Sequence, residues 1–239
     1  MSNYVVVIPA RYASERLPGK PLREINGKPM IQHVVERGEE SAARELVVAT
    51  DDQRIADACE KFGATVCMTG DQHRSGSERI AEVCDIMDWH DDTIIVNLQG
   101  DEPTMPARLI DQCAALLTES DADISTLASP VVSQQDYENP NVVKTVLDDN
   151  GNALYFSRSP IPHGDSKLAL HHHGIYAYRA GILRRLVAAP AAKLEVAERL
   201  EQLRALSLGM KIRVAIPQTR PGAGVDTEED LQAVADELS

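Results

Sequence analysis

Aromatic residues are scarce in this 239-residue chain: they make up 4% of it, with one tryptophan and two phenylalanines. The hydrophobic core must therefore be aliphatic, which is typical of a parallel sheet covered by helices. No apolar run approaches the roughly 20 residues that a membrane-spanning helix needs. The N-terminus also lacks the basic stretch, apolar run and cleavage site of a signal peptide. These absences predict a cytoplasmic protein without a membrane partner.

Positive charge is also in short supply, because 24 Lys and Arg face 37 Asp and Glu and give a net charge of −13. An acidic chain repels a polyanion, so we expect no nucleic-acid partner. A small anionic ligand is compatible with this balance, because a few cations are enough to line one pocket. Hydrophobic residues make up 43% of the chain, which excludes a mostly disordered protein.

Cysteine is rare and forms neither a C-x-x-C pair nor the spacing of a metal site. The simplest interpretation is that the four cysteines are small buried residues of a protein in a reducing compartment. They are Cys59, Cys67, Cys84 and Cys113.

Strand-like and helix-like segments alternate through the first half of the chain. Apolar and β-branched runs predict strands at 4–8, 46–49, 65–68 and 93–98. Helical periodicity between and after them predicts helices at 30–41, 55–62, 77–87 and 107–117. This alternation predicts an α/β fold with a doubly wound, mostly parallel sheet.

The second half has shorter strand signals, at 124–128, 142–147, 153–156 and 173–178. Residues 149–152 read Asp-Asn-Gly-Asn, a strong hairpin-turn signal. We interpret residues of approximately 131–180 as a smaller mixed β lobe on a single domain that spans 1–239. A last helix is predicted at 227–238.

The loop after the first strand carries three cations, Arg11, Arg16 and Lys20. Ligands of open α/β sheets bind at the carboxyl ends of strands, and such a loop suits a triphosphate. The loop has neither the P-loop nor the dinucleotide-binding pattern. The alternative is a solvated basic loop without a ligand.

Two acidic positions are candidates for a magnesium site. Asp101 follows the strand at 93–98, and Asp226 lies in a glycine-containing segment before the last helix. Mg²⁺ prefers one or two carboxylates together with phosphate oxygens. The alternatives are that Asp101 caps a turn before Pro103 and that Asp226 is the N-cap of the last helix.

Four further stretches carry polar side chains of interest. Residues 73–79 open a helix whose N-terminus suits an anion or a base, and Arg158 ends a strand. Three successive histidines, 171–173, alternate sides of an extended chain and cannot all bind one metal. For His173 we favour a substrate contact or a structural role. Glu201 and Gln202 lie in a helix, where charges are usually solvated.

Taken together, these segments resemble one family closely, the 3-deoxy-manno-octulosonate cytidylyltransferases (CMP-Kdo synthetases). The resemblance spans nearly the whole chain and keeps the order of the motifs. It rests on residues 8–14, 16–22, 26–31, 48–51, 75–76, 78–79, 96–97, 99–103, 139–141, 153–158, 174–176, 200–204, 222 and 224–227.

The resemblance implies a nucleotide-diphospho-sugar transferase-like fold and a Mg²⁺-dependent enzyme of lipopolysaccharide biosynthesis. Such an enzyme transfers CMP from CTP to the anomeric hydroxyl of the acid sugar and releases pyrophosphate. The family's mixed lobe forms a homodimer, which implies that residues 131–180 do so here.

The resemblance also implies a role for each matching residue. Catalysis would depend on Arg16, Lys20, Asp101 and Asp226, the last two as Mg²⁺ ligands. CTP would be bound by Pro9, Ala10, Arg11, Ser14, Arg16, Lys20, Ser75, Gly76, Gln99 and Asp101. The sugar would be bound by Arg79, Gln99, Arg158, His173, Tyr176, Glu201 and Gln202, and Arg79 and Arg158 suit its carboxylate.

Two stretches depart from the family pattern. Residues 159–166 are short and lack the usual tryptophan, and residues 194–199 lack the usual His-Ile. Both neighbour the implied sugar site, so we hypothesise a modified sugar such as the 8-amino-3,8-dideoxy form. Alternatives are a cytidylyltransferase for another acid sugar, such as a sialic acid, and a non-catalytic nucleotide-binding module. The proton acceptor for the anomeric hydroxyl is left open.

Overall fold

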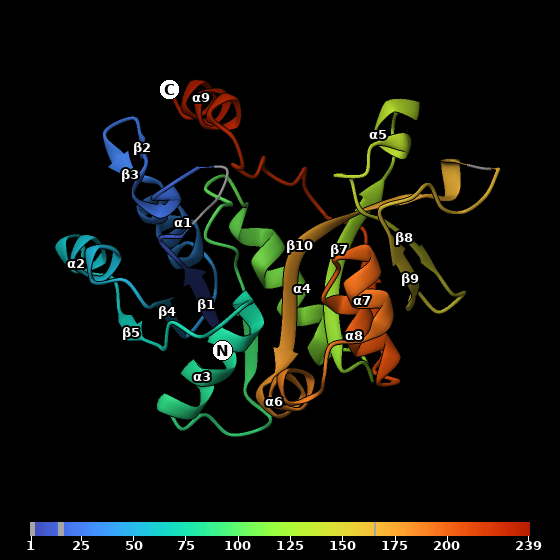
Figure 1. Cartoon of the computed structure of the whole chain (residues 1–239), viewed down its shortest axis with the longest axis horizontal. Coiled ribbons are helices and arrows are strands. Elements are labelled where there is room, and N and C mark those ends of the chain that lie inside the picture. The colour runs from blue at the N-terminus through green and yellow to red at the C-terminus, as the bar shows by residue number, and fades with distance from the viewer. Residues whose placement is uncertain (1–2, 14–16, 165) are drawn as a thin grey trace.

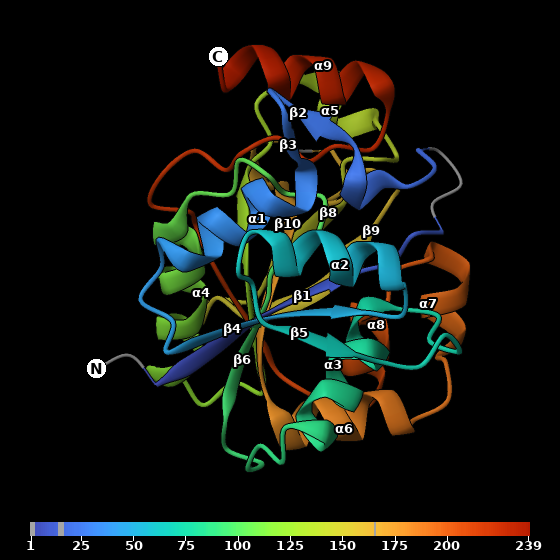
Figure 2. The same cartoon turned by 90° about the vertical axis from the view of Figure 1, so that its left-hand side faces the viewer.

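One sheet organises the molecule in a computed structural model that describes residues 3–13, 17–164 and 166–239 (Figures 1 and 2). Its main path runs β11-β7-β10-β6-β1-β4-β5. β1 pairs in parallel with β4 and β6, β4 with β5, and β7 with β11, whereas β10 is antiparallel to β6 and β7. The predicted α/β class with a mostly parallel sheet is confirmed. The strands are β1 (Tyr4–Ala10), β4 (Glu45–Thr50), β5 (Val66–Met68), β6 (Ile94–Asn97), β7 (Ile124–Pro130), β10 (Leu170–Arg179) and β11 (Ile212–Ala215).

Helices cover both faces of the sheet, and β1 shows why. Its side chains alternate, so Val5 and Val7 enter one hydrophobic cluster while Val6 and Ile8 enter another. Each fully buried aliphatic side chain contributes roughly 1.5–3 kcal/mol. The first cluster packs against α3 (Gly76–Ile86), α6 (Ala180–Ala188) and α8 (Gln202–Ser207); the second packs against α1 (Met30–Glu39), α2 (Gln53–Lys61) and α4 (Ala107–Thr118).

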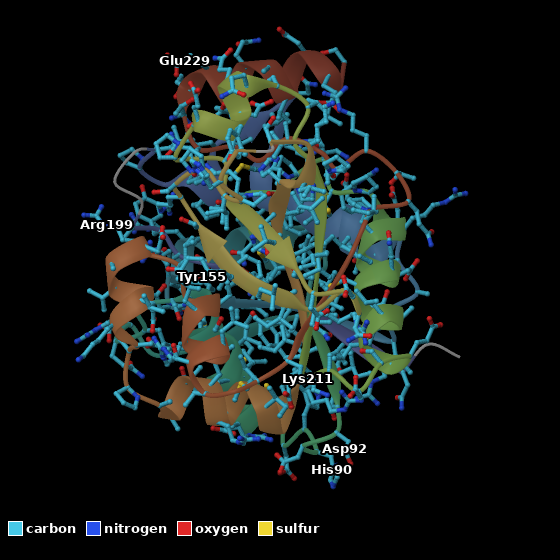
Figure 3. The ribbon with its side chains drawn as sticks, turned by 90° about the vertical axis from the view of Figure 1, so that its right-hand side faces the viewer. His90, Asp92, Tyr155, Arg199, Lys211 and Glu229 are labelled. Carbon is cyan, nitrogen blue, oxygen red and sulfur yellow. The ribbon has the colours of Figure 1, made fainter. Side chains whose placement is uncertain are left out.

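A third, smaller cluster lies at the carboxyl edge of the sheet. It joins Leu17, Ile25 and Met30 to Val225, Leu231 and Val234. The elements around it are η1 (Lys20–Leu22), β2 (Glu24–Ile25), β3 (Lys28–Pro29) and α9 (Glu228–Glu237). In Figure 3, Glu229 of α9 lies at the opposite end of the molecule from His90 and Asp92, which precede β6. The first and last parts of the chain therefore meet at the edge where β1 and β6 end.

The predicted lobe is present but merges with the sheet. β8 (Lys144–Leu147) and β9 (Ala153–Ser157) form an antiparallel hairpin, accompanied by α5 (Gln134–Glu138) and η2 (Ser166–Leu168). Asp148 accepts hydrogen bonds from the backbone of Asn150 and Asn152, which confirms the turn at 149–152. β10 begins beside β8 and continues between β7 and β6, so its second half belongs to the main sheet.

All four cysteines are free and buried, as predicted. Burial raises the pKa of the Cys59, Cys84 and Cys113 thiols to about 12, so they are protonated at neutral pH. Within the described residues, no helix has both the length and the apolar character needed to cross a membrane.

Candidate active site

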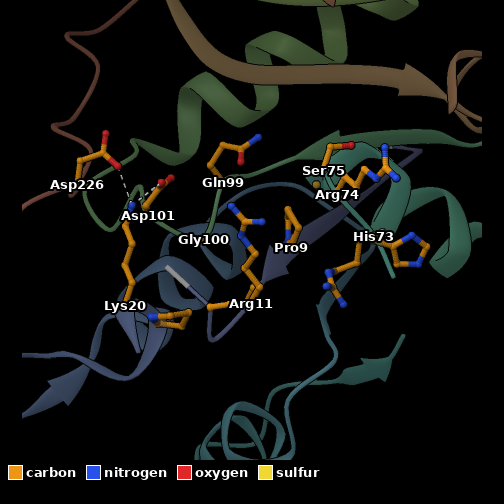
Figure 4. A pocket seen from close by; sticks show the side chains of 15 residues that line it. Pro9, Arg11, Lys20, His73, Arg74, Ser75, Gln99, Gly100, Asp101 and Asp226 are labelled. Carbon is orange, nitrogen blue, oxygen red and sulfur yellow. Dashed lines mark hydrogen bonds and ion pairs between the residues drawn. The ribbon is translucent and has the colours of Figure 1, made fainter. Parts of the chain in front are cut away.

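A cavity of about 690 Å³ opens where β1 and β6 end and α3 begins (Figure 4). Ten of the residues singled out from the sequence line it, and they come from five separate stretches of the chain. Ser14 and Arg16 lie outside the described residues. The ten are Pro9, Ala10, Arg11, Lys20, Ser75, Gly76, Arg79, Gln99, Asp101 and Asp226.

The centre of the cavity is an ion-paired triad. Lys20 Nζ donates hydrogen bonds to Asp101 Oδ2 at 2.7 Å and to Asp226 Oδ1 at 3.0 Å. Burial alone would lower the pKa of Lys20. The negative charges of the two carboxylates and their hydrogen bonds to Lys20 outweigh burial and raise that pKa. Two carboxylates from distant parts of the chain therefore converge on one cation.

The interpretation of Asp226 as the N-cap of α9 does not fit the geometry. The side chain that caps α9 is Thr227, whose Oγ1 accepts from the backbone N–H of Asp230. Asp226 is thus left to face Lys20. Helix α4 begins at Ala107 with Pro106 as its N-cap, so Asp101 does not cap it.

The donor set fits a magnesium ion. The Asp101 and Asp226 side chains are 39% and 48% exposed and face the cavity. No group of three or more metal-ligating side chains occurs among the described residues. Two protein carboxylates, completed by water and phosphate oxygens, are the set that Mg²⁺ commonly uses.

Next to this triad lies Glu102, a half-buried carboxyl group that was not predicted from the sequence. Burial, together with the negative charges of Asp101 and Asp226, raises the pKa of Glu102 to about 8. At neutral pH this side chain is therefore largely protonated and adds little negative charge to the site.

The opposite wall of the cavity is the N-terminus of α3. Ser75 is the N-cap and accepts from the backbone N–H of Glu78 at 3.3 Å. A Cβ at Gly76 would lie 3.1 Å from the ring of Pro9, so glycine lets α3 pack closely on the end of β1. A helix N-terminus presents free N–H groups and a positive dipole end, which suits an anion or a polar base edge.

Five lining residues were not predicted individually: Ala13, Pro21, His73, Arg74 and Gly100. For His73 and Arg74, the sequence signal is that residues 73–79 are predicted to open a helix. His73 Nε2 lies 2.5 Å from Glu82 Oε2, so its ring is fixed by α3. A Cβ at Gly100 would lie 2.8 Å from the carbonyl of Pro9, which requires glycine where the two loops meet.

Arg79 lines the cavity, but its guanidinium is already bound to protein. It lies 3.1 Å from Asp51 Oδ2 and donates to Thr69 Oγ1 at 2.5 Å and to the Gly70 carbonyl at 3.3 Å. The Arg79 side chain is 4% exposed. Arg79 thus ties together the loops after β4 and β5 and adds positive charge to the wall.

The other residues expected at the sugar do not line this cavity. Arg158 donates from Nε to the Glu198 carbonyl at 2.8 Å and from Nη1 to the Pro140 carbonyl at 3.0 Å. It therefore ties the end of β9 to α7 (Lys193–Glu198). Gln202 is buried at the start of α8.

Glu201 lies beside the cavity, behind Ser75. It accepts from Ser75 Oγ at 2.8 Å and from Ser77 Oγ at 3.0 Å. Burial raises the pKa of Glu201, although these two hydroxyl donors oppose the shift. Glu201 also lines a second cavity of about 340 Å³, which shares Arg74 and Ser75 with the first.

The histidines separate as strand alternation requires, and the result differs from the expectation for His173. His173 Nε2 is 2.7 Å from Ser129 Oγ, on the face opposite Tyr176. His172 instead packs against Tyr176, with ring centroids 5.2 Å apart, and against Phe156. Counting in steps of two from Tyr176 selects His172, so the signal was available in the sequence.

Comparison with known proteins identifies the family. A family model described as cytidylyltransferase matches residues 5–212. The chain belongs to the cytidylyltransferase family. A solved CMP:2-keto-3-deoxy-manno-octonic acid synthetase, complexed with CTP, is 42% identical to this cytidylyltransferase with a TM-score of 0.93; the match covers 99% of this chain and 98% of that one.

More distant structures share the fold alone. A cytidylyltransferase from Leptospira borgpetersenii serovar Hardjo-bovis (strain JB197) is 18% identical with a TM-score of 0.65, over 98% of this chain and 86% of that chain. A 4-diphosphocytidyl-2C-methyl-D-erythritol synthase is 16% identical with a TM-score of 0.69, over 100% and 99%. The nucleotide-diphospho-sugar transferase-like fold expected from the sequence is thus confirmed.

Proposed function

We propose that this cytidylyltransferase transfers CMP from CTP to the anomeric hydroxyl of 3-deoxy-manno-octulosonate, for lipopolysaccharide biosynthesis. The observation that carries the proposal is the 42% identity over 99% of the chain to a synthetase named for that sugar. The sugar oxygen attacks the α-phosphorus of CTP, the bond to the β-phosphate oxygen breaks, and pyrophosphate leaves with its electron pair.

In this proposal the centre of the cavity handles the charge of the triphosphate. Asp101 and Asp226 hold Mg²⁺, which supplies Lewis-acid stabilisation of phosphate oxygens when bound. Lys20 and Arg11 neutralise the phosphates and the departing pyrophosphate, because phosphoryl-type transfer depends mainly on positioning and charge. All four residues line the same cavity.

The α3 side of the cavity suits the nucleoside. Pro9 and Ala10 end β1, and Ser75 and Gly76 begin α3 directly opposite them. The backbone polar groups there read the edge of the cytosine ring in our proposal. In our proposal the α-phosphorus lies near Gln99, which lines the same cavity.

We place the acceptor beside Gln99, on the side of the cavity where β10 packs. A Cβ at Gly174 would lie 3.8 Å from Gln99 Cγ, so the two elements approach closely there. Tyr176 and Glu201 are close enough to interact electrostatically. Burial and the negative charge of Glu201 raise the pKa of the Tyr176 hydroxyl. The phenol is therefore a neutral hydrogen-bonding group at working pH.

We also propose a homodimer formed through the lobe at 131–180. Three large apolar side chains of this region are exposed: Val132 at 89%, Leu154 at 62% and Leu168 at 67%. In our proposal these exposed apolar side chains belong to the surface that a second copy of the chain covers. Sedimentation at twice 26.1 kDa supports the dimer, and sedimentation at 26.1 kDa contradicts it.

The test of function is pyrophosphate release by the purified protein with CTP, Mg²⁺ and one acceptor at a time. The acceptors are 3-deoxy-manno-octulosonate, its 8-amino-3,8-dideoxy form and a sialic acid. We expect the two octulosonates to react and the sialic acid to fail, and the ratio of their kcat/KM values decides between the 8-hydroxy and 8-amino sugars. CTP binding without pyrophosphate release under any acceptor would favour the non-catalytic alternative.

A further inference from the structure

The chain segment that delivers Asp226 to the cavity has no regular structure. Residues 216–227, which we call the strap, connect β11 to α9 without a helix or strand. Ala223 and Gly224 in its middle are exposed. Since the strap lacks a ladder of backbone hydrogen bonds, its position depends on the burial of Val225 and on a few hydrogen bonds with neighbouring residues.

Thr104 makes two of these hydrogen bonds, both with Ala223. Its Oγ1 accepts from the backbone N–H of Ala223 at 2.9 Å and lies 3.2 Å from the Ala223 carbonyl, to which it donates. Two residues further, the N–H of Val225 donates to the carbonyl of Asp101 at 2.9 Å. Asp226 follows directly, so these bonds set where its carboxylate lies relative to Asp101.

The fit between the strap and the turn at 101–104 leaves no room for side chains on the inner side of the strap. A Cβ at Gly222 would lie 2.2 Å from Thr104 Oγ1 and 2.4 Å from the Thr104 carbonyl oxygen. A Cβ at Gly224 would lie 3.0 Å from Glu102 Oε1. The glycines therefore allow the strap to lie directly on the residues that follow β6.

We propose that Thr104 is a positioning residue: its hydrogen bonds to Ala223 hold the strap so that Asp226 and Asp101 face one cation. The inference rests on the proposed function, because that cation is Mg²⁺ during the reaction. Thr104 itself does not line the cavity, and its effect passes through the strap. Its hydroxyl makes both bonds to Ala223, so a residue without a hydroxyl breaks both while keeping the same volume.

The experiment compares Thr104→Val with Thr104→Ser, which keeps the hydroxyl. Binding of Mn²⁺ to the full chain is measured without substrates by electron paramagnetic resonance. We expect Thr104→Val to raise the Mn²⁺ Kd about tenfold, as befits one or two lost hydrogen bonds, and Thr104→Ser to stay within about twofold. Thr118→Val is the matched control, because Thr118 donates within α4 to the Ala114 carbonyl.

A second readout separates positioning from simple instability. Thr104→Val should recover nearly full kcat when Mg²⁺ is raised, whereas a damaged fold would not respond to the metal. Gly222→Ala, which pushes the strap off Thr104, should weaken Mn²⁺ binding in the same direction. Unchanged Mn²⁺ binding in Thr104→Val would overturn the proposal, as would absent binding in the unchanged chain. Normal Mn²⁺ binding without pyrophosphate release would instead overturn the proposed function and leave the positioning role of Thr104 unaffected.

Discussion

The two sides of the site use their positive charges differently. On the nucleotide side, Lys20 reaches into the cavity and bridges Asp101 and Asp226. On the proposed acceptor side, around β9 and α7, Arg158 donates to the backbone carbonyls of Glu198 and Pro140. The Lys20 ammonium is paired with two partly exposed carboxylates that line a cavity, whereas the Arg158 guanidinium is bound to backbone carbonyls and ties β9 to α7.

The difference teaches that charge in a motif does not by itself reveal a ligand. Both sides carry arginines or lysines that the sequence analysis assigned to anionic substrates. Only the structure shows which donors face a cavity and which are already occupied. The carboxylates of Asp101 and Asp226 are arranged around the Lys20 ammonium, and Arg158 is held among the elements around β9 and α7.

The largest expected effect is on the nucleotide side. Asp101→Asn and Asp226→Asn should each lower kcat by roughly 100-fold or more, because a bound metal contributes several kcal/mol and each ~1.4 kcal/mol is tenfold. Both should also raise the Mg²⁺ concentration needed for half-maximal rate. Asp92→Asn, at the opposite end of the molecule, is the matched control. Near-normal kcat in either variant would remove that residue from the cation site.

On the acceptor side, replacing the neutral, buried His172 should make the unfolding free energy less dependent on pH. Burial, with repulsion from His173 and His171, lowers the pKa of His172 to about 3. In the unfolded chain His172 takes up a proton near pH 6.5, whereas in the native chain it stays neutral down to about pH 3. The unfolding free energy is therefore highest above pH 6.5 and declines as the pH falls toward 3. Lowering the pH from 7 to 5 should therefore reduce the unfolding free energy by about 2 kcal/mol because of this histidine.

His172→Gln should therefore show a smaller loss of unfolding free energy between pH 7 and pH 5, measured by urea denaturation. His90→Gln is the control, because His90 is exposed. Equal losses in His172→Gln and the unchanged chain would show that His172 is accessible to protons in the native state.

A smaller effect is expected for the arginine that ties β9 to α7. Arg158→Ala should lower the unfolding free energy by about 1–2 kcal/mol, since two short bonds to carbonyls are lost, and should leave the KM for CTP within about twofold. Arg158→Lys should recover little, because an ammonium does not reproduce the guanidinium fork. Arg199→Ala tests an exposed neighbour. A raised KM for the sugar without any loss of stability would make Arg158 a substrate ligand instead.

Much of the nucleotide side was predictable because it depends on topology. The carboxyl ends of the parallel strands β1 and β6 meet at one edge, so Lys20 and Asp101 had to approach each other. The Asp-Asn-Gly-Asn turn was predictable for a local reason, since its backbone needs Gly151 at φ +80°.

The acceptor side was less predictable because it depends on pairing over long distances. β10 reads as a short lobe strand, yet it continues for ten residues into the main sheet with an irregularity between His173 and Tyr176. Which histidine faces Tyr176 follows from alternation, but the carbonyls that occupy Arg158 come from Pro140 and Glu198, which no local pattern connects.

The central claim is that the Lys20, Asp101 and Asp226 cluster is the magnesium site of CMP transfer to an octulosonate. Its most direct test is the formation of the CMP-sugar from CTP and 3-deoxy-manno-octulosonate, followed by mass spectrometry with Mg²⁺ present, with Mg²⁺ chelated, and in Asp226→Asn. The account predicts the CMP-sugar only in the unchanged protein with Mg²⁺. Equal formation with the metal chelated, or in Asp226→Asn, would contradict it.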